Sequence, residues 1–363
     1  MRAGGGIGKM RRGLVAAALL VGTVAGAEPV VPEAVVPEAP VKPKTKTRPG
    51  VPAEQPVSEG GDGLSRDTKK GGLQVKPFGR VYARMSADER DEFTRDLSLA
   101  SARVGLAASL SHVEAEVTAD LSSKSILKDA FVRVADEAKR LRLYGGQFKA
   151  PFLARENQSS WTLPTVRRGL VADYLEDTQN LGGRRLGLMG EVSLKEAWKL
   201  RVSGGVFQGS KDADGVRGGE DASFRASIRP FKVLTLGASG YLTEIFKGTR
   251  NVALAADAAL RLGGLEVTGE YVNGRIPLGP FAAQMALASY TLPVMEGWAV
   301  QPVVGAEMLQ LLGPLKARGY GLVGGFNILY SQHFRAQFQA ERALRPGDQA
   351  PGLEYSLQLA TRF

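Results

Sequence analysis

The chain contains no cysteine and only two histidines, and it has no long uninterrupted apolar stretch. The absence of cysteine excludes disulfides, thiol nucleophiles, cysteine-ligated metals and a lipid-modified N-terminal cysteine. A membrane-spanning helix needs roughly 18 or more consecutive apolar residues, and no segment reaches that length. His112 and His333 are far apart in the sequence, and two histidines alone make a poor metal site. The sequence therefore predicts no cofactor, no bound metal and no enzyme activity.

Residues 1–27 have the pattern of a secretory signal peptide. Arg11 and Arg12 precede an apolar stretch over residues 14–24, and small residues at 25–27 form a cleavage pattern. We therefore expect export. The formal net charge is +10, which in another setting would favour a nucleic-acid partner. Export and the lack of a basic helix or an aromatic stacking platform argue against nucleic acid, so we interpret the charge as a field inside a cavity.

Residues 28–72 have a composition that does not build a core. Eight of the 19 prolines lie here, with a repeated Val-Val-Pro-Glu-Ala segment and a following run of basic residues from Lys42 to Arg48. Such density of proline favours an extended, polyproline II-like chain with little apolar surface to bury. We expect a disordered periplasmic tail. Contact of its lysine run with peptidoglycan or a periplasmic partner stays open as an alternative.

From residue 73 onward the chain consists of short segments in which apolar and polar residues alternate. A period of two is the signature of a β-strand with one apolar and one polar face. Sixteen strands are predicted, at residues 73–85, 96–110, 112–121, 126–136, 140–149, 184–193, 198–208, 221–229, 233–242, 250–261, 264–272, 281–292, 297–308, 319–329, 333–342 and 353–363. Residues 73–363 are therefore expected to form one all-β domain.

The lengths of the connections alternate along this domain. Connections after even-numbered strands are mostly tight turns, whereas those after odd-numbered strands are mostly long, at residues 86–95, 150–183, 209–220, 243–249, 273–280, 309–318 and 343–352. Short periplasmic turns and longer outer loops are typical of outer-membrane barrels. A soluble sandwich has no reason to alternate in this regular way.

The number of strands decides whether the apolar face of each strand points outward or into the barrel. Strand by strand, the alternation of Val113 and Val117 with Glu114 and Glu116 fits a soluble barrel as well as a membrane barrel. A closed barrel of 16 strands, however, has a lumen too wide for side chains to fill. We therefore expect a transmembrane antiparallel β-barrel in the bacterial outer membrane, with its apolar face toward lipid and its polar face lining water.

The chain ends on Phe363, the last residue of an alternating segment. A terminal aromatic residue in this position resembles the targeting signal of bacterial outer-membrane barrels. We expect the barrel-assembly machinery to recognise Phe363, and the last strand to close against the first, near residues 73–85. Aromatic residues are expected to mark the membrane interfaces, among them Trp198, Trp298, Tyr241, Tyr271 and Tyr320.

The longest connection, residues 150–183, is the third outer loop and spans 34 residues. Connections of this length inside a compact domain are usually functional. If this loop folds into so wide a barrel, it forms the constriction.

Two segments and the following loop carry a family resemblance. Leu127 to Val132, Leu141 to Phe152, and the loop from Ser159 through Leu163-Pro164 and Arg168 to Asp173 resemble the phosphate-selective porin O and P family. The resemblance is most specific over residues 126–175 and extends as a pattern over the rest of the barrel. It implies a sixteen-stranded outer-membrane channel, a third loop folded into the lumen, and a homotrimer. In its phosphate-transporting members, basic side chains pass anions.

Basic residues on the expected inner faces concentrate in the first half of the barrel and in the long loop, whereas inner acids lie mostly in the second half. Walls of arginine favour anions, and the planar guanidinium suits phosphate and carboxylate. The predicted channel-lining residues are Arg80, Arg84, Arg103, Arg133, Arg140, Arg142, Arg155, Arg167, Arg168, Arg201 and Arg225. Alternatively, these arginines pair with loop acids such as Glu156, Asp173, Glu176 and Asp177 and hold the loop in place.

The sequence thus predicts a porin for small anions, phosphate or polyphosphate among them. Its expected partners are outer-membrane lipid, small anionic solutes and two further copies of itself. A non-specific general diffusion porin is one alternative. A poorly conducting anchor, whose tail contacts peptidoglycan, is the other.

Overall fold

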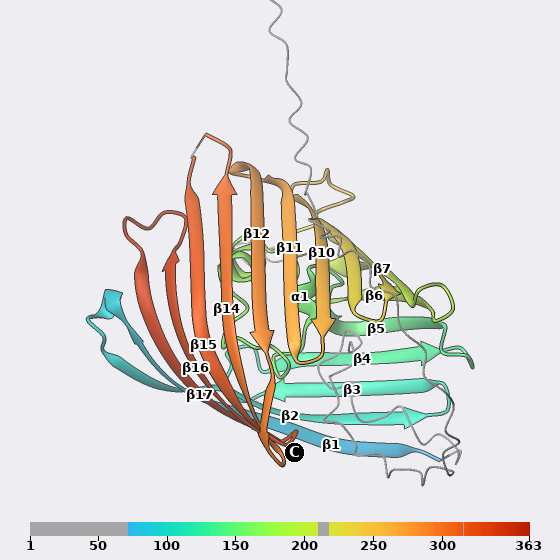
Figure 1. The fold of residues 1–363 in the computed structure, drawn as a ribbon. Coiled ribbons are helices and arrows are strands. Elements are labelled where there is room, and N and C mark those ends of the chain that lie inside the picture. The colour runs from blue at the N-terminus through green and yellow to red at the C-terminus, as the bar shows by residue number, and fades with distance from the viewer. Residues whose placement is uncertain (1–71, 210–217, 315) are drawn as a thin grey trace, which may run out of the picture. The chain divides into compact units, whose positions relative to one another are not determined.

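The computed structural model describes residues 72–209, 218–314 and 316–363, and these form a closed antiparallel β-barrel (Figure 1). The predicted signal peptide at 1–27 and the predicted tail, except for residue 72, lie outside the described residues. Among the described residues, no helix is long and apolar enough to cross a membrane.

The barrel wall has sixteen strand positions, as the alternating pattern predicts. Each strand pairs with its sequence neighbours, and the last pairs with the first. The strands β12 and β13 both pair with β14 and are separated by a single residue, so together they occupy one strand position. The strands are β1 (Gln74–Asp88), β2 (Arg95–Leu110), β3 (Val113–Asp120), β4 (Leu127–Ala135), β5 (Leu141–Lys149), β6 (Arg184–Leu194), β7 (Leu200–Gln208), β8 (Glu220–Phe231), β9 (Leu234–Leu242), β10 (Val252–Leu262), β11 (Leu265–Ile276), β12 (Gly279–Tyr290), β13 (Leu292–Met295), β14 (Trp298–Leu311), β15 (Arg318–Tyr330), β16 (Phe334–Leu344) and β17 (Gly352–Arg362).

The two ends of the barrel differ in the length of their connections. At the short-turn end, connections such as 111–112, 232–233 and 263–264 are two residues long. At the long-loop end they are mostly longer and include residues 150–183 and the connection 89–94, which holds the 3-10 helix η1 (Glu89–Asp91).

The long loop predicted at 273–280 is wrong. The strand β11 runs to Ile276 and β12 begins at Gly279, which leaves a two-residue connection. Gly274 and Pro280 suggested a loop, but both lie in the ladder. The reason is steric: a Cβ on Gly274 would lie 2.0 Å from the carbonyl oxygen of Val252. Glycine at this position therefore allows two strands to approach closely and does not form a turn.

The outward faces of the strands are apolar, as predicted. Leu188, Val304 and Leu106 are 71%, 62% and 56% exposed, and they alternate with inward-facing residues. Large apolar side chains this exposed on successive strands form a continuous apolar outer surface, which in water would be unfavourable. This surface suits a hydrocarbon environment.

Barrel closure involves the last residue of the chain. Phe363 and Gly79 exchange two backbone hydrogen bonds of 3.1 Å, and β17 pairs with β1 in the register Arg80 to Arg362. The Phe363 ring occupies the place of the missing side chain, since a Cβ on Gly79 would lie 2.3 Å from it. The expected closure of the last strand on the first is confirmed.

The loop 150–183 folds into the lumen and brings a hydrophobic core with it. It contains α1 (Ala154–Asn157), α2 (Leu170–Asp173) and the π-helix η2 (Tyr174–Thr178), and Figure 1 shows α1 behind β10–β12. Its apolar residues are almost fully buried against inner positions of β9–β14. The cluster includes Phe152, Leu153, Val171, Leu175, Leu181, Tyr241, Ala253, Val272, Phe281 and Leu309.

This core corrects the expectation that the inner wall is polar throughout. Near the long-loop end, the inner wall of β9–β14 is apolar because the loop excludes water from it. Tyr241 is likewise not at a membrane interface. It is fully buried in the lumen, its ring lies 5.6 Å from that of Phe152, and its hydroxyl donates a 2.9 Å hydrogen bond to Asp221.

Candidate functional site: the loop across the lumen

The first part of the loop is anchored to the wall formed by β9 and β11. The Glu270 carboxylate accepts hydrogen bonds from the backbone N–H groups of Ala154 at 2.7 Å and Arg155 at 3.3 Å. The N–H of Leu153 donates to the Ser239 hydroxyl at 3.3 Å. These bonds satisfy amides that the single turn of α1 leaves without intrahelical acceptors, so the loop entry is fixed to the wall.

The middle of the loop is held by β15–β17. Arg335 donates to the carbonyl oxygens of Trp161 and Leu163, the latter at 2.5 Å. Further bonds join the Asn327 amide to the Pro164 carbonyl oxygen at 2.8 Å, and the Val166 N–H to the Gln339 side-chain oxygen at 2.8 Å. Arg167 pairs with Glu354 at 2.8 Å. The loop therefore reaches a second sector of the wall.

The last part of the loop is anchored to β14. The N–H of Val171 donates to the Glu307 carboxylate at 2.9 Å. Gly169 allows this approach, because a Cβ there would lie 2.2 Å from the other carboxylate oxygen. With anchors on β9, β11, β14 and β15–β17, the loop spans the lumen. Its predicted inward fold is confirmed.

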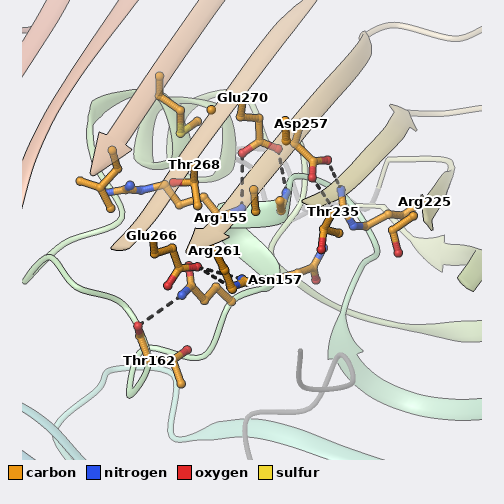
Figure 2. Close-up of a pocket in the computed structure, with 18 of the residues that line it drawn as sticks. Arg155, Asn157, Thr162, Arg225, Thr235, Asp257, Arg261, Glu266, Thr268 and Glu270 are labelled. Atoms are coloured by element: carbon orange, nitrogen blue, oxygen red, sulfur yellow. Dashed lines mark hydrogen bonds and ion pairs between the residues drawn. The ribbon is translucent and has the colours of Figure 1, made fainter. Parts of the chain in front are cut away.

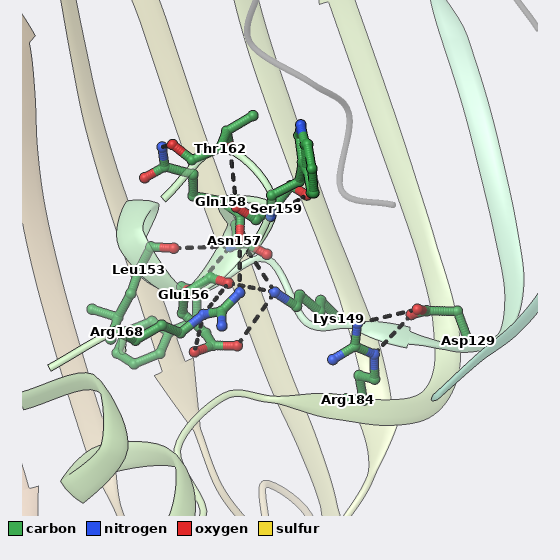
Figure 3. A network of polar contacts seen from close by, with 12 residues as sticks. Asp129, Lys149, Leu153, Glu156, Asn157, Gln158, Ser159, Thr162, Arg168 and Arg184 are labelled. Atoms are coloured by element: carbon green, nitrogen blue, oxygen red, sulfur yellow. Dashed lines mark hydrogen bonds and ion pairs between the residues drawn. The ribbon is translucent and has the colours of Figure 1, made fainter. Parts of the chain in front are cut away.

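A network of buried charges stabilises the loop from within (Figure 3). The Lys149 ammonium donates to the Glu156 carbonyl oxygen at 2.7 Å and lies 3.7 Å from its carboxylate. The Arg168 guanidinium lies 3.2 Å from the same carboxylate, and Arg184 pairs with Asp129 at 3.0 Å. Buried ion pairs of this kind hold a loop only while both partners are charged.

Two loop carboxyl groups, those of Glu156 and Glu176, influence each other's pKa within this network. Burial would raise the pKa of Glu156, but the charges of Arg168 and Lys149 outweigh it and hold that pKa below its usual value. Burial, together with the charge of Glu156, raises the pKa of Glu176 to about 8. At neutral pH Glu176 is therefore protonated beside the ionised Glu156, and the two carboxylates repel each other once Glu176 ionises.

At least seven of the eleven predicted channel-lining arginines pair with an acid, and five of these acids belong to the wall. The pairs are Arg103 with Asp120 at 3.1 Å, Arg133 with Glu114, Arg142 with Glu191, Arg225 with Asp257 at 2.7 Å, and Arg167 with Glu354. Arg140 lies in the turn before β5 and pairs with the exposed Glu196 at 3.1 Å. Of the loop acids expected as partners, Glu156 pairs with Arg168. The proposed holding role of arginines thus applies mainly to strand-to-strand contacts.

Arg84 and Arg155 have neutral hydrogen-bond partners. Arg84 donates to the Gln358 side-chain oxygen at 2.8 Å, and Arg155 to the Thr165 hydroxyl at 2.9 Å. Arg80 is buried against Tyr82 and lies 3.5 Å from the Ser159 hydroxyl. Arg201 has no acidic partner within 4 Å among the described residues. The channel-lining role of the predicted arginines stays a prediction.

A cavity of about 200 Å³ lies between the first part of the loop and the inner wall of β7–β12 (Figure 2). It opens to solvent, and its lining includes Arg201, Arg225, Arg261, Asp257, Glu266 and Glu270. Loop residues from Ala154 to Thr162 form its other side. The cavity is therefore a compartment whose size and charge the loop helps to set.

Sequence reasoning missed the anchors that position the loop. Arg335, Asn327 and Gln339 lie in the second half of the barrel, where the charged inner residues expected from the sequence are mostly acids, and Arg335 is 4% exposed. Their inward position in the alternation was the available signal. Within the described part of the chain, no cluster of three or more potential metal ligands occurs. His112 and His333 lie in separate turns at the short-turn end.

Comparisons with known proteins give the fold. No protein-family model matches the chain, and no curated protein matches it. In-vitro folded OmpT, an outer membrane protein of Vibrio cholerae in trimer form, aligns with a TM-score of 0.59 at 11% identity over 80% of this chain and 99% of that chain. An anion-selective porin from Comamonas acidovorans gives 0.58 at 11% identity over 80% and 100%, and a high-pH structure of Pseudomonas putida OprB gives 0.61 at 10% identity over 81% and 94%. The chain has the sixteen-stranded barrel fold of these proteins.

Proposed function

We propose that the chain is an outer-membrane porin that passes small polar solutes and prefers anions. The observation that carries this proposal is the loop 150–183, which spans a wide barrel and is bonded to several sectors of its inner wall. A loop fixed in this way narrows a lumen without requiring the barrel to move. Narrowing is what turns a wide barrel into a size- and charge-sensitive channel.

The anion preference is supported by cations that no acid neutralises. Arg84, Arg155 and Arg201 face the lumen or the loop and have only neutral partners or none within 4 Å among the described residues. The facing carboxylates of Glu270 and Glu307 are occupied by backbone amides of the loop. Guanidinium groups of this kind attract small anions, phosphate or polyphosphate among them.

The apolar outer face supports placement in the outer membrane in contact with lipid. In this proposal the short-turn end faces the periplasm, as in other outer-membrane barrels, and Phe363 is read by the barrel-assembly machinery. A homotrimer is supported by the likeness to OmpT in trimer form. No enzyme activity is proposed.

A general diffusion porin is the second candidate. It is favoured by the ion pairs of the wall, because Arg103, Arg133, Arg142 and Arg225 each have an acidic partner close by. Opposite charges paired on nearby strands cancel at a distance and leave little net field. In that case solute size, and not charge, sets passage.

Single-channel recording in planar bilayers tests the proposal. We expect stable stepwise conductance and, under a potassium chloride gradient, a reversal potential that indicates preference for chloride. Added phosphate should reduce the chloride current if phosphate enters the same path. A folded barrel that stays silent would refute the porin function and favour the anchor, whereas preference for potassium would refute the role of the unpaired arginines.

A further inference from the structure

The acids of the cavity beneath the loop are all engaged, while one of its cations is not. Asp257 receives two bonds from Arg225, at 2.7 and 3.0 Å, and Glu266 pairs with Arg261 at 2.8 Å (Figure 2). Glu270 accepts the loop amides described above. Four arginines and three carboxylates line the cavity. The lining therefore carries one positive charge in excess.

Arg201 is the residue that supplies this excess charge. The guanidinium of Arg155, the other lining arginine outside an ion pair, is turned to the loop, where it bonds to the Arg168 carbonyl oxygen and the Thr165 hydroxyl. Arg201 lies on β7 opposite Ser227 of β8, is half-buried, and has no acid within 4 Å among the described residues. Its donors are thus the ones available to an anion in the cavity.

The rest of the lining is rich in neutral hydrogen-bonding groups. Hydroxyls and amides come from both the wall and the loop, and apolar surface lies between them. The neutral polar groups are those of Asn157, Gln158, Ser159, Thr162, Ser203, Ser227, Thr235 and Thr268, and the apolar surface is that of Ala154, Ala258, Ala259, Met285 and Leu287. Hydroxyl and amide groups both donate and accept, so they match the hydroxyls of a polyol.

We propose that this cavity binds a small polyhydroxylated carboxylate, a sugar acid, with its carboxylate on Arg201. The proposal rests on the porin function to the extent that the solute must reach the lumen. A single free guanidinium matches one carboxylate through two parallel hydrogen bonds. A phosphate dianion would bring a second charge without a cation, and a neutral sugar would leave the guanidinium unpaired in a partly desolvated site.

Titration calorimetry of the full chain, folded in detergent, tests the site with gluconate as the probe. We expect gluconate to bind, and Arg201→Gln to weaken it by about 10- to 100-fold, the range of a charge-assisted hydrogen bond. Arg201→Lys keeps the charge but loses the planar fork, so we expect an intermediate loss. The matched control is Arg140→Gln, which removes the same charge at the same end of the barrel but from an exposed pair with Glu196.

Three further probes define the class of ligand. Glucose has hydroxyls without the charge, acetate has the charge with few partners, and glucose 6-phosphate has hydroxyls with a dianion. Each should bind more weakly than gluconate. Equal affinity of glucose or acetate, tighter binding of glucose 6-phosphate, or unchanged gluconate binding by the folded Arg201→Gln and Arg201→Lys proteins would overturn the proposal.

Calorimetry separates this site from the porin function. If the protein conducts ions but does not bind gluconate, the binding site is refuted and the porin function stands. If it binds gluconate but shows no conductance, the porin function is refuted and the binding site stands. The characteristic change in gel mobility of folded barrels on heating verifies the fold of each variant before either measurement.

Discussion

Replacing Glu307 with alanine is expected to release the last part of the loop from the barrel wall. The Glu307 carboxylate accepts the Val171 N–H at 2.9 Å and lies directly against Gly169. A hydrogen bond to a charged group contributes about 1.5–3 kcal/mol, so its loss should raise the ratio of undocked to docked loop by roughly 10- to 150-fold. Leu170 and Val171 keep their apolar contacts, and the release is therefore partial.

Trypsin measures this release directly, because Arg167 and Arg168 precede the anchored segment. If cleavage requires the undocked state, its rate follows the population of that state, so the Glu307→Ala protein should be cut at least about 10-fold faster. Its single-channel current should also fluctuate more. The control is Glu296→Ala, which removes the same charge from an exposed turn next to the same strand. Equal cleavage rates of Glu307→Ala and the parent protein would show that the bond does not dock the loop.

Three further changes test other parts of the structure. As pH rises from about 5 to about 8, the free energy of unfolding should fall, because Glu176 holds a proton in the folded state that it has released in the unfolded chain. Above pH 8 the dependence on pH should level off. Thermal unfolding of Glu176→Gln should show a weaker dependence on pH over the same range. Gly79→Val should collide with the terminal aromatic ring and cost about 1–3 kcal/mol, whereas Gly324→Val, which meets open space, should leave the urea midpoint unchanged. Arg84→Ala should reduce chloride preference in the reversal potential more than Arg103→Ala, since Asp120 neutralises Arg103; equal effects would contradict this.

The strands could be predicted because their signal is local. Alternation of apolar and polar residues survives in each strand, so predicted and observed bounds differ mostly by a few residues. The error at 273–280 arose because glycine and proline have two uses, in turns and at close strand approach. Only the position of Gly274 opposite Phe281 in the ladder separates the two.

The contacts of the loop could not be predicted, because they join residues far apart in the chain. Arg167 and Glu354 are separated by 187 positions, and Asn327 and Pro164 by 163. Which arginine is neutralised depends on register and on the path of the loop, and neither is encoded near the arginine itself. For this reason the sequence predicts the same channel-lining role for Arg201 and for paired residues such as Arg225.

Because of the core inside the lumen, the loop contributes to the stability of the barrel as well as to the width of the pore. Here the inner wall carries Tyr241, Val272, Phe281 and Leu309, which are buried in one core with the apolar residues of the loop. Deleting residues 150–183 would expose these apolar residues of the inner wall to water, so the result would not be simply a wider pore. Pore width and barrel integrity are therefore coupled in this chain, and the pore can be tuned at single side chains more safely than by deletion.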